Sequence, residues 1–214
     1  MPQTERGMRT RASLLVAAEA VFLEHGYHEA SVVKITEHAG VSQGTFYLYF
    51  TSKKQVFDEL VVDLNRRVRQ AMSEGAATGR DRREAEHRGF EAFFRFTAEH
   101  PALYRIIRQA EFVSPEMHKL HYTRIVEGYV AALQRAAAEG ELVELDPVVT
   151  SWALMGIGEI VGMRWVLWDE KPGEVPDTVM AEVARLIDRI LGMPGGQAAN
   201  DRPRKRAGGV KVAR

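Results

Sequence analysis

Apolar residues repeat with a helical period along almost the whole chain, and this periodicity is the feature that most constrains the fold. Between Arg9 and Leu191 they recur three and four residues apart, which is the spacing of one face of an amphipathic helix. No segment combines the strict alternation and the β-branched residues that are typical of a half-buried strand. The pattern therefore predicts an all-α chain of about nine helices.

Residues that begin helices divide this periodicity into segments. Ser52 and Gln55 have the spacing of a capping box, so a long helix is expected from Lys53 to about Ser73. Other helix starts are marked by an acidic cap, a hydroxyl cap or a proline at Asp81, Pro101, Ser114–Pro115 and Asp146–Pro147.

Composition excludes several classes of protein and site. The chain has no cysteine, which excludes a disulfide scaffold, a Cys-ligated zinc site and a thiol nucleophile. The most apolar stretch, Trp152 to Trp168, is interrupted by Glu159 and Arg164, so we expect no transmembrane helix and no membrane partner. No apolar segment of a secretory signal follows the N-terminus, which favours a cytoplasmic protein. The 29 basic and 29 acidic residues balance, so any basic surface is local.

Two short helical segments near the N-terminus carry the main functional signal. They cover residues 32–39 and 42–50 and are joined by Gly40 and Val41, which is the arrangement of a helix-turn-helix. The exposed face of the second segment would consist of Gln43, Gly44, Thr45, Tyr47 and Leu48. Glutamine can read an adenine edge and threonine or leucine a thymine methyl group, so this face indicates binding in the major groove of double-stranded DNA. A purely structural three-helix subdomain is the alternative.

The same stretch resembles a known family. The likeness is carried by Arg11–Phe22, Gly26-Tyr27, Ser31-Val32, Ile35, Ala39–Ser42, Gly44–Tyr47, Tyr49-Phe50 and Ser52-Lys53, which are similar to the tetracycline-repressor-like (TetR) transcriptional regulators. Thr36 and His38 depart from the family pattern. The resemblance implies a homodimer that binds a near-palindromic operator and releases it when a small molecule enters the C-terminal domain.

The resemblance also implies residue roles by position. The groove face would be Gln43, Gly44, Thr45 and Tyr47, and the phosphate contacts would come from Ser31, Ser42, Tyr49 and Lys53. Arg6, Arg9 and Arg11 would form either an arm near the minor groove or a solvated terminus. The expected organisation is a flexible arm at 1–8, a DNA-binding domain at 9–52, a ligand-binding and dimerisation domain at 53–192 and a disordered basic tail at 193–214.

The C-terminal half has more aromatic residues than a plain bundle needs, and charged residues interrupt its apolar stripes. The expected effector contacts are Phe90, Phe94, Arg105, Arg108, Phe112, Tyr122, Tyr129, Trp152, Met155, Glu159 and Met163. Arg105 and Arg108 would face an anionic effector, because the surrounding segment resembles family members that respond to acyl-CoA thioesters or fatty acids. Glu159 would need a partner if buried, either in a salt bridge or in the effector site.

Glycines and methionines between residues 155 and 163 predict that this helix approaches another element closely, because glycine inside a helix is otherwise unfavourable. We expect a dimer interface through the last two helices, at about residues 147–168 and 177–191. A narrow cavity wall is the alternative explanation of the glycines.

No catalytic motif or cofactor motif is evident. His118 and His121 lack a third ligand, so a solvated pair is favoured over a metal site. A di-iron bundle would need a Glu-x-x-His motif on each of two helices, and the sequence does not supply such a pair of motifs. No nucleotide loop or Ser-His-Asp arrangement is found either. The preferred function is a ligand-responsive DNA-binding regulator, a repressor, with an operator and a small effector as partners. An all-α enzyme or a helical adaptor that does not bind DNA is the alternative.

Overall fold

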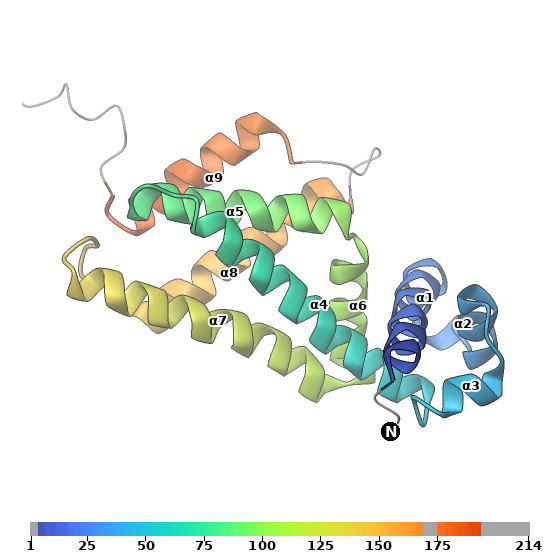
Figure 1. The fold of residues 1–214 in the computed structure, drawn as a ribbon. Helices are drawn as coiled ribbons and strands as arrows, with labels where there is room; N and C mark the ends of the chain where they lie inside the picture. Colours follow the sequence, from blue (N-terminus) through green and yellow to red (C-terminus); the bar gives the residue numbers. More distant parts are fainter. Residues whose placement is uncertain (1–3, 169–174, 194–214) are drawn as a thin grey trace, which may run out of the picture.

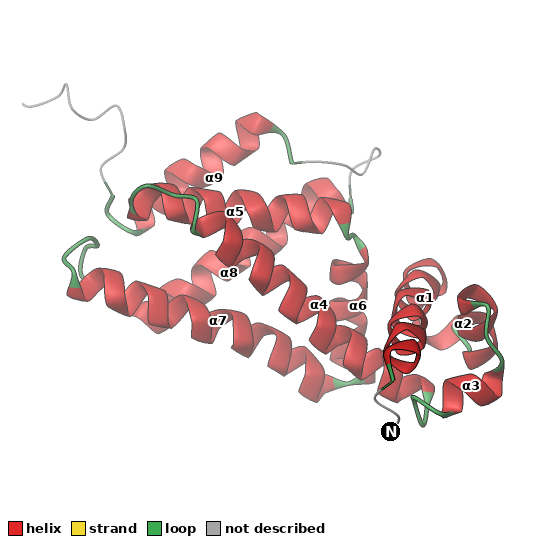
Figure 2. Ribbon diagram, in the orientation of Figure 1, coloured by secondary structure: helices red, strands yellow, loops and turns green. Residues whose placement is uncertain are grey.

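The computed structural model describes residues 4–168 and 175–193, and these residues contain helices and no strand (Figure 2). The helices are α1 (Glu5–Glu29), α2 (Val32–Ala39), α3 (Gln43–Tyr47), α4 (Lys53–Ala76), α5 (Arg82–Glu99), α6 (Ala102–Val113), α7 (Pro115–Ala138), α8 (Pro147–Val166) and α9 (Asp177–Ile190) (Figure 1). The predicted all-α fold is confirmed. None of these helices is long and apolar enough to cross a membrane. The basic tail from residue 194 onward lies outside the described residues.

Helices α1, α2 and α3 pack together at one end of the molecule, and α5 to α9 form a bundle at the other end (Figure 1). Helix α4 belongs to both parts, because it packs against α1 and also against α5 and α7. One buried cluster of apolar side chains joins α1–α4 to α6, and a second fills the bundle. The N-terminal part is therefore attached to the bundle through α4 and α6.

Most helix starts agree with the capping residues of the sequence. Ser52 Oγ accepts a hydrogen bond from the Gln55 backbone N–H at 3.1 Å, which confirms the start of α4. The Gln55 side chain accepts in return from the backbone N–H of Thr51, one residue before the expected position. Asp81 and Asp146 likewise accept hydrogen bonds from backbone N–H groups in the first turns of α5 and α8.

Helix α1 begins before the predicted Arg9. Thr4 Oγ1 accepts a hydrogen bond from the Gly7 N–H at 3.2 Å and caps a helix that starts at Glu5. Residues 5–8, which the sequence assigns to a flexible arm, are therefore helical. The apolar periodicity did not reveal this turn because it carries almost no apolar side chains. Near the other end, Gly26 has a φ of 71° and interrupts the helical backbone.

The glycines of α8 serve two different surfaces. A Cβ atom added to Gly158 would lie 3.4 Å from the Phe93 ring, and one added to Gly162 would collide with the Tyr104 hydroxyl group. These two glycines thus let α8 approach α5 and α6 inside the bundle. Gly156 is exposed and has no atom within 4 Å of its added Cβ, so it lies on the outward face.

We expect Gly162→Ala to destabilise the protein by about 1–3 kcal/mol, because the new methyl group overpacks the contact with Tyr104. The measurement is urea denaturation followed by circular dichroism. Gly128→Ala is the matched control on the exposed face of α7, where an added Cβ meets no atom within 4 Å. This control should gain up to about 1 kcal/mol from helix propensity. Equal stability of Gly162→Ala and the wild type would contradict the packing argument.

Candidate DNA-binding surface and effector cavity

Helix α3 presents uncharged polar and aromatic side chains to solvent. Ser42 caps it by accepting a hydrogen bond from the Thr45 N–H at 3.1 Å, and Phe46 anchors it as a fully buried side chain. Tyr47 is 57% exposed and Leu48 is 67% exposed. Tyr47 therefore has no role in the core. This arrangement leaves the face free to enter a groove.

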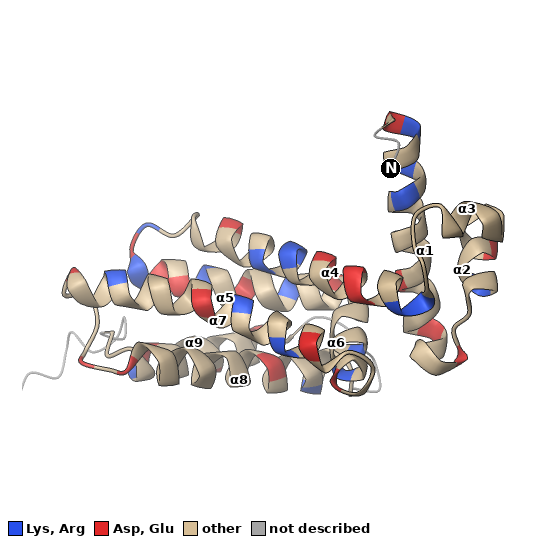
Figure 3. Ribbon diagram, turned by 90° about the horizontal axis from the view of Figure 1, so that it is seen from below, with Lys and Arg blue, Asp and Glu red and all other residues tan. Residues whose placement is uncertain are grey.

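Gln43 and Gly44 are also exposed, and Thr45 is half-buried beside Ser42. Figure 3 shows that α3 carries no Lys, Arg, Asp or Glu, whereas the first turns of α1 project past it and carry basic residues. The only polar groups on the α3 face are therefore uncharged, which suits contact with base edges more than with phosphates.

The turn before α3 sets the direction of α3 relative to α2. Gly40 adopts a left-handed conformation with a φ of 66° and ends α2. The N–H of Val41 then donates to the carbonyl of Thr36 at 3.0 Å. Phe46 and Phe50 pack near each other below the turn, with ring centroids 5.5 Å apart. The turn and these two buried rings thus hold α2 and α3 against the core.

The residues expected to contact phosphates differ in burial and in whether their side chains already form hydrogen bonds within the chain. Ser31 caps α2 by accepting from the Lys34 N–H at 3.2 Å, and Tyr49 is half-buried. Lys53 Nζ donates to the carbonyl oxygens of Tyr27 and Ala30, both at 2.7 Å, and lies 4.4 Å from the centroid of the Tyr27 ring. Burial lowers the pKa of Lys53. Lys53 therefore fixes the end of α1, and a phosphate contact would have to displace one of these bonds.

Three neighbouring cavities lie inside the bundle. The largest, about 410 Å³, lies between α4, α5 and α7 and is lined by Met72, Phe90, Ile125 and Tyr129 together with Arg69, Arg82, Glu86 and Arg135. The second, about 30 Å³, shares Met72, Phe90, Ile125 and Tyr129 with the largest and extends to Leu154, Met155 and Gly158 of α8. The third, about 20 Å³, lies between Phe93, Tyr104, His121, Tyr122 and Glu159.

The structure brings together only part of the expected effector set. Five of the predicted residues line these three cavities: Phe90, Tyr122, Tyr129, Met155 and Glu159. Met163 is buried in the bundle core, and Trp152 is largely exposed on α8. The cavity residues that sequence reasoning missed include Met72, Phe93 and Ile125.

Arg105, Arg108 and Phe112 line none of the cavities found in the described residues, so their contact with an effector stays a prediction. All three are exposed on α6, and the exposed fraction of Phe112 is 82%. Helix α6 buries the opposite face, which contains Leu103, Ile106 and Ile107, and the two arginines flank that face on the solvent side.

Glu159 is half-buried and has a partner that the sequence did not indicate. Tyr122 Oη donates a hydrogen bond to Glu159 Oε1 at 2.6 Å, so a phenol takes the place of the expected salt bridge. Burial, with the neighbouring carboxylate, raises the pKa of Tyr122 above its usual range. The phenol therefore stays protonated and keeps this bond to the carboxylate.

His121 is buried rather than solvated. Asn65 Nδ2 lies 3.2 Å from His121 Nδ1 and 2.9 Å from its carbonyl oxygen, and Asn65 Oδ1 accepts from Arg69 Nε. This amide orientation makes His121 Nδ1 the acceptor, so the ring is neutral. Burial lowers the pKa of His121 to about 3, which agrees with the neutral form.

Glu86 is a buried ionisable residue that sequence reasoning did not select. Its carboxylate accepts hydrogen bonds from Tyr129 Oη and from the guanidinium group of Arg82. Burial raises the pKa of Glu86 to about 7, and the nearby Arg82 opposes this rise. Glu86 precedes Phe90 by four residues on the same face of α5, so its position on an apolar stripe was a usable signal.

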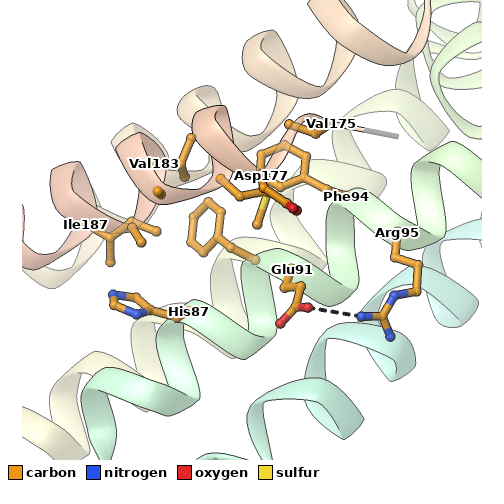
Figure 4. A pocket seen from close by; sticks show the side chains of 12 residues that line it. His87, Glu91, Phe94, Arg95, Val175, Asp177, Val183 and Ile187 are labelled. Atoms are coloured by element: carbon orange, nitrogen blue, oxygen red, sulfur yellow. Dashed lines mark hydrogen bonds and ion pairs between the residues drawn. The ribbon is translucent and has the colours of Figure 1, made fainter. Parts of the chain in front are cut away.

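A separate groove of about 330 Å³ lies between α5 and α9 (Figure 4). Phe94, Val183 and Ile187 form its apolar floor, and Glu91 and Arg95 pair on its rim at 3.2 Å. Phe94 was expected among the effector contacts and lies here instead of in the interior cavities. Val175 and Asp177 also line this groove.

Comparison with known proteins agrees with this geometry. Residues 14–60 match the family model described as bacterial regulatory proteins, tetR family. The chain is 30% identical to the HTH-type transcriptional regulator EthR of Mycolicibacterium smegmatis, over 92% of this chain and 97% of that protein. It is 27% identical to the fatty acid metabolism regulator protein of Bacillus subtilis, over 74% and 84%. The fatty acid degradation regulator FadR from Bacillus halodurans superposes with a TM-score of 0.74 at 25% identity, covering 86% of this chain and 95% of that chain.

Glu86→Gln tests the effect of burial on this carboxyl group. The pKa of Glu86 is about 7 in the folded protein and 4.5 without the fold, so the folded state binds the extra proton between these values. Stability therefore falls as the pH rises through this window. Relative to the variant, the wild type should lose about 2–3 kcal/mol of unfolding free energy between pH 5 and pH 8, measured by urea denaturation. A difference that does not change with pH would count against the raised pKa.

Proposed function

The chain belongs to the tetR family of bacterial regulatory proteins, and we propose that it acts as a homodimeric repressor released from its operator by a hydrophobic effector. As a member of this family it is a ligand-responsive, DNA-binding transcriptional regulator. Its relatives are regulators by name rather than enzymes. The observation that carries the DNA-binding part of the proposal is the exposed face of α3, with Tyr47 pointing away from the core.

On this proposal, Gln43, Gly44, Thr45 and Tyr47 contact base edges in the major groove. Ser31, Ser42 and Tyr49 contact phosphates, and Lys53 joins them only if it leaves the carbonyls of α1. Of these groups only Lys53 is cationic, so two neutralised phosphates per dimer would give a log–log salt dependence of about −2, which the N-terminal arginines of α1 would steepen if they also reach phosphates. The balanced net charge is compatible with this because the contacts are local.

Dimerisation through α8 and α9 is supported by apolar side chains that the single chain leaves exposed. Val149, Trp152 and Ile160 lie on the outward face of α8, and Leu186 is exposed on α9. Gly156 lies on the same α8 face with open space above it, which would let a helix of a second copy approach closely. Covering these side chains with a second copy would remove a large apolar patch from water.

The effector would occupy the interior cavities between α4, α5, α7 and α8. The part near Met155 has a volume of only about 30 Å³, close to that of one water molecule, so a larger ligand must push helices apart. Two of the relatives are named for fatty acid metabolism or degradation. We therefore take fatty acids and acyl-CoA thioesters as the first effectors to test.

A route from this cavity to the DNA-binding part runs through α6. Leu103, Tyr104 and Ile107 of α6 line the smallest cavity, and Gln109 Oε1 accepts a hydrogen bond from the Tyr27 N–H at 2.5 Å. The carbonyl of the same Tyr27 is held by Lys53 of α4. A shift of α6 or α4 would therefore move the end of α1. In a dimer this changes the spacing of the two α3 helices, which must be about 34–36 Å apart to enter successive grooves.

The central test is binding of the protein to its own upstream DNA, titrated against salt by fluorescence anisotropy. We expect specific binding with the salt dependence given above, and we expect Tyr47→Ala to abolish specific binding without changing the circular dichroism spectrum. Phe46→Ala is the contrasting variant, because its buried ring should cost about 3–5 kcal/mol of stability. Absence of binding by the wild type at low salt, or unfolding of Tyr47→Ala, would overturn the proposed DNA surface.

We expect Gln109→Ala to weaken the coupling between the two ends of the molecule. The variant should bind the operator within a few-fold of the wild type, because Gln109 lies outside the α3 face. It should need about tenfold more dodecanoyl-CoA for half-release, equivalent to about 1.4 kcal/mol of lost coupling. Gln134→Ala, on the exposed side of α7, is the control. Identical release curves for Gln109→Ala and the wild type would exclude this route.

A further inference from the structure

We propose that the arginine-lined end of the largest cavity binds the anionic head group of an amphipathic effector whose apolar tail extends toward α8. This inference rests on the proposed function, because it assigns a chemical class to the ligand of the same cavity. It replaces Arg105 and Arg108, which the sequence favoured for this task, by three arginines that face the cavity.

Three helices each contribute an arginine to the lining of this cavity. Arg69 comes from α4, Arg82 from α5 and Arg135 from α7. Helices α4 and α7 draw apart toward the end of the bundle remote from α1–α3 (Figure 1). Exposed residues at the rim, among them Ser73 and Arg135, show that this end is open to solvent. A charged head group can therefore remain partly hydrated here while its tail is buried.

The charges at this end do not balance. Arg82 is paired with Glu86. Arg69 donates its Nε–H to the neutral side-chain oxygen of Asn65 at 3.1 Å, and neither it nor Arg135 forms an ion pair with any described residue. Arg82 Nε is in addition buried without a hydrogen-bond acceptor. A buried donor without an acceptor is unfavourable, so an anionic oxygen at this place would supply the acceptor that Arg82 Nε lacks.

Glu86 does not make this a site for a cation. Both of its carboxylate oxygens are engaged, one by Arg82 and the other by Tyr129. The single carboxylate is outnumbered by the three guanidinium groups around the cavity. The burial that raises the pKa of Glu86 also lets it become neutral when a second anion arrives beside Arg82. The site is thus built to accept negative charge.

The other end of the cavity is suited to a hydrocarbon chain. Met72, Phe90, Ile125 and Tyr129 line both the arginine-lined cavity and the small cavity beside it. Beyond them, Leu154 and Met155 extend the apolar wall into α8. A ligand with its head among the arginines would therefore direct its tail along these residues. Carboxylates and phosphate-bearing thioesters share this chemistry, so the experiment must separate the two sources.

The test compares amphiphiles that have the same twelve-carbon tail and different heads. Dodecanoate, 1-dodecanol and dodecylamine are titrated below their aggregation limits by isothermal calorimetry, and dodecanoyl-CoA serves as the phosphate-bearing arm. We expect dodecanoate or dodecanoyl-CoA to bind at least about tenfold more tightly than 1-dodecanol, and dodecylamine to bind most weakly. The tighter of the two anions identifies the source of the head group.

Arg135→Gln tests the assignment to residues. Arg135 is exposed and forms no ion pair in the described part of the chain, so its loss should leave the fold intact. It should weaken binding of the anionic ligand at least about fivefold and leave 1-dodecanol unchanged. Arg124→Gln is the matched control, since Arg124 is exposed on the same helix and lines none of the cavities.

The outcomes separate this inference from the proposed function. If 1-dodecanol binds as tightly as the anions, or if Arg135→Gln and Arg124→Gln behave alike, the head-group site is overturned while a hydrophobic effector still stands. If none of the four compounds binds although the protein binds its operator, both the head-group site and the amphiphilic effector are overturned. In that case the DNA-binding function remains. Preferential, Arg135-dependent binding of an anion supports the inference.

Discussion

The packing of α4 is the constraint on which the rest of the structure depends. Its buried stripe includes Val56, Phe57, Leu60, Leu64 and Val68, all nearly inaccessible to solvent. Burial of side chains of this size stabilises a fold by about 1.5–3 kcal/mol each, so the helix is firmly held along its length. Along its length it packs against α1, α5, α6 and α7. A displacement of α4 within the bundle would therefore be felt by α1, and through α1 by α2 and α3.

Local sequence rules predicted much of this architecture. Ser52, Asp81 and Asp146 marked helix starts because a capping side chain acts within a few residues of its own position. The turn at Gly40 and the exposed face of α3 could be placed for the same reason. The early start of α1 was missed because Thr4 caps a turn that lacks an apolar stripe. Periodicity detects faces that are buried, and that turn buries almost nothing.

The proposed effector site could be predicted only in part. Aromatic residues and methionines could be assigned to the bundle, but whether each lines a cavity depends on contacts between helices far apart in sequence. The arginines show this most clearly. Arg105 and Arg108 flank apolar residues on α6 but are exposed, whereas Arg69, Arg82 and Arg135 come from three helices and line one cavity. That shared lining depends on how α4, α5 and α7 cross, and no short segment encodes a crossing.

The narrow apolar space beside Met155 has a consequence for the response of the protein in the cell. A hydrocarbon chain would fit here only after the helices separate, and the free energy of that separation would weaken the observed binding. The same distortion is what would be transmitted to the operator-binding end. With a looser interior, the effector would bind at a lower concentration but would distort the operator-binding end less. On the proposed function, the tightness of this cavity would thus set the effector concentration at which the protein responds, and residues that only fill space there, such as Leu154, would help to determine that concentration.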